Sequence, residues 1–181
     1  MRQQLISILA ALIPVTPVIA AEQIVVRFSP IEQDISVKEL RAFADRQVQS
    51  PTIAAIIEKA SLNPAQIQTA LTLEFDLKQF ELTVPLVDRL LGSYAAEIVL
   101  RELGQGIRPK AGEATVQALR GTIITSLSDD GKISAIEFLE KYPTDLLIDG
   151  NVIQAMVGRV LQDIQTLREP ILKILSSQRL K

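Results

Sequence analysis

One stretch of the sequence constrains the fold more than any other: Gln23–Arg46, QIVVRFSPIEQDISVKELRAFADR. Residues 24–28 are mostly β-branched or aromatic, Ser29-Pro30 is a turn signal, and residues 34–37 form a second short extended run. A pattern of apolar residues at helical spacing follows at once. The stretch therefore predicts a β-hairpin that leads directly into a helix, and we expect the later helices to be arranged on this strand pair.

Several helices are predicted from capping signals and from helical periodicity. The sequence from Ser36 to Glu39 is a capping box, which predicts a helix from Val37 to about Arg46. Ser50-Pro51 and Asn63-Pro64 each place a capping residue directly before a proline, which is typical of a helix start. Further helical patterns cover 76–89 in two pieces divided at Pro85, 94–103, 113–127, the residues up to Tyr142, and the stretch after Gly150. The residues predicted to face inward include Ala70, Leu71, Leu73, Ile98 and Val99.

A third short strand is predicted near the end of the same domain. Leu146–Ile148 is an apolar run that can pair with residues 24–27 and close a small mixed sheet. Arg108–Gly112, by contrast, has the composition of a loop. The predicted fold class is α+β and predominantly α: a multi-helix bundle with a small two- or three-stranded sheet formed near both ends of the mature chain. With 48 % hydrophobic and 22 % charged residues, the composition is that of a globular domain.

The first residues have the composition of an export signal. Arg2 precedes an apolar run from Leu5 to Ile19, and small residues follow, so we expect cleavage after Ala20 or Ala21. The alternative is an uncleaved membrane anchor or a buried helix. There is no twin-Arg pair, which indicates the general secretory route and a periplasmic or extracellular location. The predicted division is a signal peptide over 1–20, a helical domain over 21–168 and a basic amphipathic tail over 169–181.

The 181-residue chain contains no Cys and no His. Disulfides, thiolate catalysis and Cys-based zinc sites are therefore excluded for this chain, as are a Ser-His-Asp triad and His-ligated metal sites. Acid–base chemistry would have to come from carboxylates, Lys or Tyr. The formal net charge of −2, with both signs interleaved, is not the pattern of a nucleic-acid-binding protein. We predict no catalytic residues, no cofactor, no metal ion and no nucleic-acid partner.

The sharpest motif-like match is Ser126–Glu137, SLSDDGKISAIE, which resembles the calcium-binding loop of an EF-hand. Such a loop needs oxygen ligands at its first, third and fifth positions, Gly at the sixth, a backbone carbonyl at the seventh and a bidentate Glu at the twelfth. These positions hold Ser126, Ser128, Asp130, Gly131, Lys132 and Glu137. Because two of the ligands are neutral hydroxyls, such a site would carry little negative charge. The alternative is a helix-turn-helix corner in which Ser134 caps the second helix.

Two further groups of charged residues have a structural and a functional interpretation. Four carboxylates that lie close in sequence form either a solvated acidic face or a catalytic pair across a substrate: Glu137, Glu140, Asp145 and Asp149. In the predicted loop, Arg108 and Lys110 either bind an anion or lie in water, as loop cations normally do.

The predicted tail is basic on one side and aliphatic on the other. Its cations are Arg168, Lys173, Arg179 and Lys181, and its apolar residues are Ile171, Leu172, Ile174, Leu175 and Leu180. Such a segment either lies on a membrane surface, docks on a partner, or forms the last helix of the bundle.

Three longer segments together resemble one family. They are AEQIVVRFSPIEQDISVKELRAFA after the leader, LGQGIRPKAGEATVQALRGTIITSLSDDGKISAIEFLEKYP in the middle, and LLIDGNVIQAMVGRVLQ near the end. Over roughly Ala21–Leu161 the chain is similar to the cyanobacterial domain family described as alpha/beta hydrolase of unknown function. The resemblance implies a helical accessory domain, which in that family often precedes a hydrolase domain that carries the nucleophile and the His. This chain has no His and ends about where that domain would begin, so no catalytic residue is carried over.

We therefore expect an exported, non-catalytic accessory or interaction domain of a hydrolase-associated family. Its partner would be an exported serine hydrolase or another protein, and the sequence leaves the oligomeric state open. The first alternative is a carrier of lipid-like ligands or a membrane-surface protein, suggested by the aliphatic helix faces and the basic tail. The second alternative, a weak esterase of the alpha/beta-hydrolase type, is disfavoured because His and a Gly-x-Ser-x-Gly turn are both missing.

Overall fold

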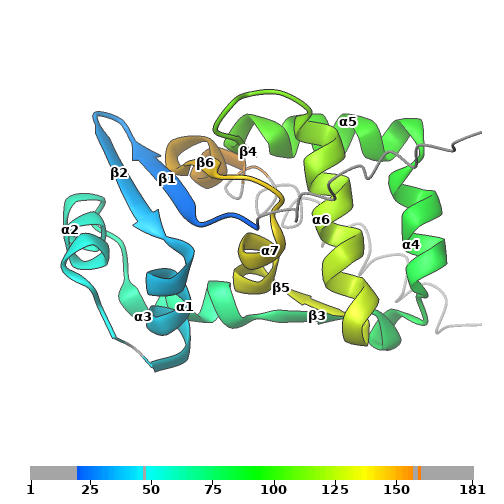
Figure 1. Ribbon diagram of the computed structural model, residues 1–181, viewed down its shortest axis with the longest axis horizontal. Coiled ribbons are helices and arrows are strands. Elements are labelled where there is room, and N and C mark those ends of the chain that lie inside the picture. The colour runs from blue at the N-terminus through cyan, green and yellow to red at the C-terminus, as the bar shows by residue number, and fades with distance from the viewer. Residues whose placement is uncertain (1–19, 47, 157–158, 160–181) are drawn as a thin grey trace, which may run out of the picture.

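The computed structural model of the protein describes residues 20–46, 48–156 and 159. The predicted leader before Ala20 and the predicted tail lie outside these residues. In chain order the elements are β1 (Gln23–Phe28), β2 (Ile31–Ser36), α1 (Val37–Arg46), α2 (Pro51–Lys59), α3 (Pro64–Thr72), β3 (Glu74–Asp76), the 3-10 helix η1 (Leu77–Phe80), α4 (Val84–Leu91), α5 (Tyr94–Gly106), β4 (Ile107–Pro109), α6 (Thr115–Asp130), β5 (Lys132–Ser134), α7 (Ala135–Lys141) and β6 (Leu146–Asp149). A further helix begins at residue 150, with helical backbone at 150–156 and 159. The fold is α+β and mostly helical, as predicted (Figure 1).

The larger sheet has four strands in the order β2-β1-β6-β4. β1 and β2 form the predicted hairpin, although β2 begins at Ile31, before the predicted run at residues 34–37. The predicted third strand is also confirmed, because β6 lies parallel to β1 with Ile24 opposite Leu146. These two strands come from opposite ends of the described chain, so their pairing closes the domain.

Part of the predicted loop at Arg108–Gly112 is instead a strand, so that prediction is wrong at its first two residues. β4 pairs antiparallel with β6, with Arg108 opposite Leu147. Pro109 is tolerated in β4 because this strand lies at the edge of the sheet, where a residue can lack an N–H. The turn itself begins at Lys110. Gly112 in this turn has a φ of 80°, a left-handed conformation that favours glycine.

The stretch from β3 to α4 contains the two predicted helical pieces and one strand that was not predicted. Two helical pieces form here as predicted, but the first is a 3-10 helix, and Pro85 lies in the first turn of the second instead of dividing them. β3 pairs antiparallel with β5, with Phe75 opposite Ile133. The Asp76 carboxylate then caps η1 by accepting from the N–H of Lys78 at 2.9 Å. The two helical pieces predicted in this stretch are thus confirmed, except at Asp76, while the three-residue strand before them was not predicted.

The predicted helix starts are confirmed by their hydrogen bonds. In the capping box before α1, the Ser36 hydroxyl accepts from the N–H of Glu39 at 3.1 Å, and the Glu39 carboxylate accepts from the N–H of Ser36 at 3.1 Å. The backbone and then the hydroxyl of Ser36 lower the pKa of Glu39 through these bonds. Ser50 and Asn63 cap α2 and α3, each directly before a proline. These starts form locally because each side chain binds an N–H within three residues.

The sheet and the helices share one hydrophobic core. Figure 1 shows α6 in the middle of the molecule, with α4 and α5 at one end and the β1–β2 hairpin, α1, α2 and α3 at the other. α7 packs between α6 and α1. Side chains at or below 1 % exposure come from strands and helices alike: Ile24, Phe43, Leu119, Ile136, Tyr142 and Leu146. In the described part of the chain, no helix has both the length and the apolar composition needed to cross a membrane.

The start of the described chain is tied to the end of α7. The N–H of Ala21 donates to the Tyr142 carbonyl at 2.7 Å, and Ala21 is buried. The N–H groups of Glu22 and Gln23 both donate to the Asp145 carboxylate, at 3.2 and 3.0 Å. Ala21 is therefore part of the fold. Cleavage was predicted after Ala20 or after Ala21. Only cleavage after Ala20 would leave Ala21 in the folded domain.

Some side chains predicted to face inward lie at the surface instead. They are Ala70, Leu73, Ile98 and Val99. Leu73, Ile98 and Val99 are 70, 52 and 65 % exposed. In α5 the core side is formed by Leu100 and Leu103, so the helix is apolar on two sides. Periodicity alone does not decide which of two apolar sides meets the core.

Candidate functional site

The four carboxylates that are close in sequence do not share a site. Glu140 binds Arg41, Glu137 binds Lys141, Asp145 accepts from the first residues of the described chain, and Asp149 caps the helix that begins at residue 150. The prediction of a solvated acidic face is therefore wrong. Each carboxylate binds a cation or a backbone N–H group, and two of the four, Glu140 and Asp145, join segments that are distant in sequence.

Arg41 on α1 and Glu140 on α7 form a bidentate ion pair. Arg41 Nε donates to Glu140 Oε1 at 2.7 Å, and Arg41 Nη2 donates to Glu140 Oε2. The hydrogen bonds to Glu140 raise the pKa of Arg41. The pair lines a hollow of about 610 Å³ whose walls carry three cationic and three acidic side chains. The formal charges of the lining therefore balance.

The EF-hand-like segment is built as a corner between two helices. α6 continues to Asp130, so the first five positions of the predicted loop are helical, and Gly131 follows with a φ of 81°. Ser126, at the first position, is fully buried. Ser128, at the third position, donates its hydroxyl to the Ile124 carbonyl at 2.6 Å. Neither hydroxyl is therefore presented in a calcium loop.

A lysine ammonium lies between two carboxylates of this corner. Lys141 Nζ donates to Asp129 Oδ2 at 2.5 Å and to Glu137 Oε1 at 2.6 Å. Burial by itself lowers the pKa of Lys141, but the hydrogen bonds to Asp129 and Glu137 outweigh burial and raise it. Glu137 is the residue that would bind calcium with both oxygens. Among the described residues, no group of three or more acidic side chains is placed to hold a metal ion.

Two buried hydroxyls have no hydrogen-bond partner among the described residues: those of Ser126 and Tyr142. Burial raises the pKa of Tyr142 to about 12. A phenol with so high a pKa stays protonated near neutral pH, where a general base must accept a proton. Tyr142 is therefore a core residue, packed against Phe138 with ring centroids 5.7 Å apart.

An exposed apolar surface is formed by Leu73, Phe75 and Phe80, which we call the aromatic face. Phe75 lies on β3 and Phe80 ends η1, and their rings stack with centroids 4.7 Å apart and an angle of 12° between the planes. Both rings are about half exposed, at 43 and 56 %. These elements lie along the lower edge of the molecule in Figure 1. The aromatic face is thus a preformed pair of rings at the surface.

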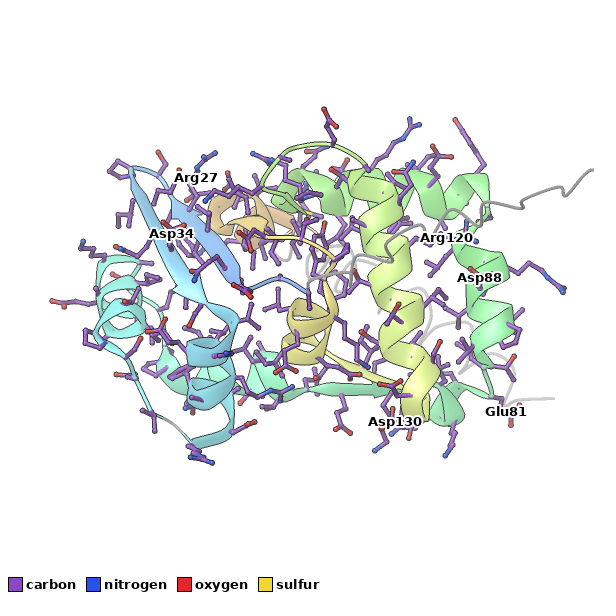
Figure 2. The ribbon with its side chains drawn as sticks, in the orientation of Figure 1. Arg27, Asp34, Glu81, Asp88, Arg120 and Asp130 are labelled. Carbon is purple, nitrogen blue, oxygen red and sulfur yellow. The ribbon has the colours of Figure 1, made fainter. Side chains whose placement is uncertain are left out.

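A second exposed apolar region lies on α4 and α5. It consists of Leu86, Leu90, Tyr94, Ile98 and Val99. No residue of α4 is buried. Figure 2 shows Arg120 of α6 beside Asp88 of α4, where Arg120 Nη2 donates to Asp88 Oδ1 at 2.8 Å and holds α4 against α6.

A model of the family described as alpha/beta hydrolase of unknown function matches residues 20–149. The chain belongs to this family. The match runs from the residue before Ala21 to the end of β6, so it covers both sheets. No curated protein and no solved structure matches the chain.

Membership of this family does not identify catalytic residues in this chain. The nucleophile of an alpha/beta hydrolase lies on a Gly-x-Ser-x-Gly turn and acts with a His. The sequence contains neither. In the described residues the larger sheet has one parallel strand pair, β1 with β6, and its other pairs are antiparallel.

The aromatic face was missed by sequence reasoning. Phe75 comes directly before the stretch 76–89, which was predicted to be helical, and Phe80 lies within it. Apolar residues of a predicted helix are expected to face the core. The signal that was available is the alternation of charged and apolar residues from Leu73 to Asp76, which is typical of a half-buried strand.

Proposed function

We propose that this chain is an exported, non-catalytic accessory domain that binds another protein through the aromatic face. The observation that carries the proposal is the stacked, half-exposed pair Phe75 and Phe80. Large aromatic side chains gain free energy when they are removed from water, by about 25 cal/mol per Å² of apolar area. They also lose little conformational freedom on binding, and they are enriched among the residues that dominate interface energies.

The surroundings of the two rings support this role. Glu74, Asp76 and Lys78 alternate with the apolar residues along the segment, and Lys132 of β5 lies 3.1 Å from the Glu74 carboxylate. These charged side chains are mostly exposed. An apolar centre with a charged and solvated border is the usual anatomy of a protein interface.

An alpha/beta hydrolase in another chain is the partner that we propose. The family to which the chain belongs is described as alpha/beta hydrolase of unknown function, and we take from this description the class of the partner. The absence of His from the sequence supports a division of labour in which the partner supplies the nucleophile and the general base.

The proposal is tested by capture from extract of the source cells with two forms of the immobilised chain, the native form and Phe75→Ala/Phe80→Ala. Captured serine hydrolases are labelled with a fluorophosphonate probe and identified by mass spectrometry. We expect the native chain to recover a labelled hydrolase and the variant to recover at least tenfold less, since each 1.4 kcal/mol of binding free energy is a factor of ten. Val48→Ala is the matched control, because Val48 is 55 % exposed between α1 and α2 and lies outside the aromatic face.

Three results would contradict the proposal. Equal recovery by native chain and variant would remove the aromatic face from the interface. Recovery of a specific partner that is not a hydrolase would refute the proposed partner class. Ester hydrolysis by the chain itself, retained on repurification and abolished by one point substitution, would show that it is an enzyme.

A further inference from the structure

The end of the described chain runs antiparallel to α5. A methyl group added at Gly106, the last residue of α5, would lie 2.6 Å from Ile153 Cδ1 and 3.4 Å from Val152 Cγ1. Further along the chain, Arg159 Nη2 lies 3.4 Å from Glu102 Oε1. Later residues of the chain therefore meet earlier residues of α5. The ion pair is exposed and contributes little stability, but it marks the direction of the chain.

The next positions along this side of α5 are exposed and apolar. Gly106, Glu102, Val99 and Ala95 are separated by four, three and four residues, so they form one line along the helix. Val99 is 65 % exposed, Ala95 is also exposed, and Ile98 lies beside the line at 52 %. The contacts at Gly106 and Glu102 thus lie next to an apolar strip on α5.

The sequence that follows has the matching spacing. Ile153, Val157, Val160 and Ile164 are also separated by four, three and four residues. In the antiparallel register that places Ile153 at Gly106, Val160 falls opposite Val99 and Ile164 falls opposite Ala95. Beyond Glu102, the register therefore pairs apolar residues with apolar residues.

We propose that residues 160–167 of this chain dock on the strip formed by Ala95, Ile98 and Val99 of α5. These residues lie outside the described ones, and they follow directly after Arg159, which already contacts α5. Because no linker separates them from the strip, their effective concentration there exceeds that of a separate molecule. When residues 160–167 dock, their apolar side is buried against α5. That side then does not contact a membrane or a second copy of the chain. The proposal concerns a surface separate from the aromatic face and does not depend on the proposed function.

Engineered cysteine pairs test this register cleanly, because the native chain has no Cys. In the full chain we would combine Val99→Cys with Val160→Cys, and in a second variant Ala95→Cys with Ile164→Cys. The control is Val99→Cys with Gln162→Cys, since Gln162 lies on the opposite side of the same helical pattern. A disulfide needs Cα atoms about 4.4–6.8 Å apart. After mild oxidation we expect an intramolecular disulfide in both test variants, at least tenfold above the control, by non-reducing electrophoresis and peptide mass spectrometry.

Other occupants of the strip give different results. Disulfide-linked dimers whose yield rises with protein concentration would replace the proposal with a second copy. Equal yields in test and control variants would show that no fixed register exists. As an independent readout, the single variant Val160→Cys should react with a maleimide at least tenfold more slowly than Gln162→Cys. Protection that appears only with vesicles of phosphatidylcholine and phosphatidylglycerol would assign the segment to a membrane surface and overturn the proposal.

Discussion

Replacing Tyr142 with Phe should make the protein more stable. The Tyr142 side chain is fully buried, and its hydroxyl has no hydrogen-bond partner among the described residues. A buried hydroxyl without a partner costs roughly 1–3 kcal/mol, whereas a Phe ring fills nearly the same volume and keeps the contact with Phe138. We expect Tyr142→Phe to raise the free energy of unfolding by about 1–2 kcal/mol near neutral pH.

The same substitution should change how stability depends on pH. Burial raises the pKa of Tyr142 from its ordinary value of 10.0 to about 12. Between these two values the unfolded chain has released the proton and the folded chain still holds it, so stability falls as the pH rises. The difference between the two pKa values corresponds to roughly 3 kcal/mol of stability, which is fully present below pH 10 and lost by about pH 12. Because Phe has no proton to lose, the advantage of Tyr142→Phe should grow across this window.

Urea unfolding followed by circular dichroism, at pH values from 7 to about 11.5, checks both effects. The matched control is Ser126→Ala, which removes the other buried hydroxyl without a partner but no group that ionises in this range. It should stabilise the protein by a similar amount at every pH. A loss of stability in Tyr142→Phe at pH 7 would show that the hydroxyl makes a hydrogen bond. A difference from native protein that stays constant above pH 10 would refute the assigned pKa.

Three further predictions concern backbone and charge contacts. Gly121 is exposed in α6, and a methyl group added there has no atom within 4 Å, so Gly121→Ala should stabilise the protein by about 0.5–1 kcal/mol. A methyl group added at Gly150 would lie 2.1 Å from Phe28 Cζ, so Gly150→Ala should cost about 3 kcal/mol of stability. Thermal unfolding in which Gly150→Ala is the more stable variant would refute the packing. Asp145→Ala should cost about 2 kcal/mol in urea unfolding, because two N–H groups lose their acceptor, and Asp145→Asn should cost less. Millimolar calcium or a chelator should leave the melting temperature unchanged, because the Lys141 ammonium already neutralises the carboxylates of Asp129 and Glu137. A melting temperature that rises by several degrees with calcium would contradict this prediction.

The elements that sequence reasoning predicted well are those whose signal is local. The capping box of Ser36 and Glu39 and the starts at Pro51 and Pro64 are complete within four residues of sequence, and the structure confirms each of them. The strand at Leu146–Ile148 was predictable because it is a short apolar run, and the structure pairs it with the apolar residues of β1.

The elements that were missed depend on distant residues. β3, β4 and β5 have three residues each, and every one of them is extended because of a partner strand far away in sequence, as Phe75 is opposite Ile133. Ile98 and Val99 were assigned to the core because apolar residues usually belong there. Which apolar side of α5 meets α6 is decided by tertiary packing and not by the period of the sequence.

The candidate sites were least predictable, because the partners of charged residues are not encoded by spacing. Arg41 and Glu140 are 99 positions apart, yet they form a bidentate pair. The match of Ser126–Glu137 to a calcium loop rests on residue types at fixed positions. It fails because α6 continues through the first five of them and because Lys141, outside the motif, binds Glu137.

The contacts that the charged side chains make indicate what kind of function to expect. An active site usually keeps polar groups that are poorly compensated, because reactivity requires a shifted pKa or an unfilled hydrogen bond in a hollow. The carboxylates around α7 are instead neutralised by Arg41 and Lys141, or bind backbone N–H groups, and these contacts stabilise the fold. Large apolar groups, in contrast, remain exposed among the described residues, above all the rings of Phe75 and Phe80. Exposed rings gain free energy by contact with another apolar surface, which is the physical reason for proposing that they bind a protein.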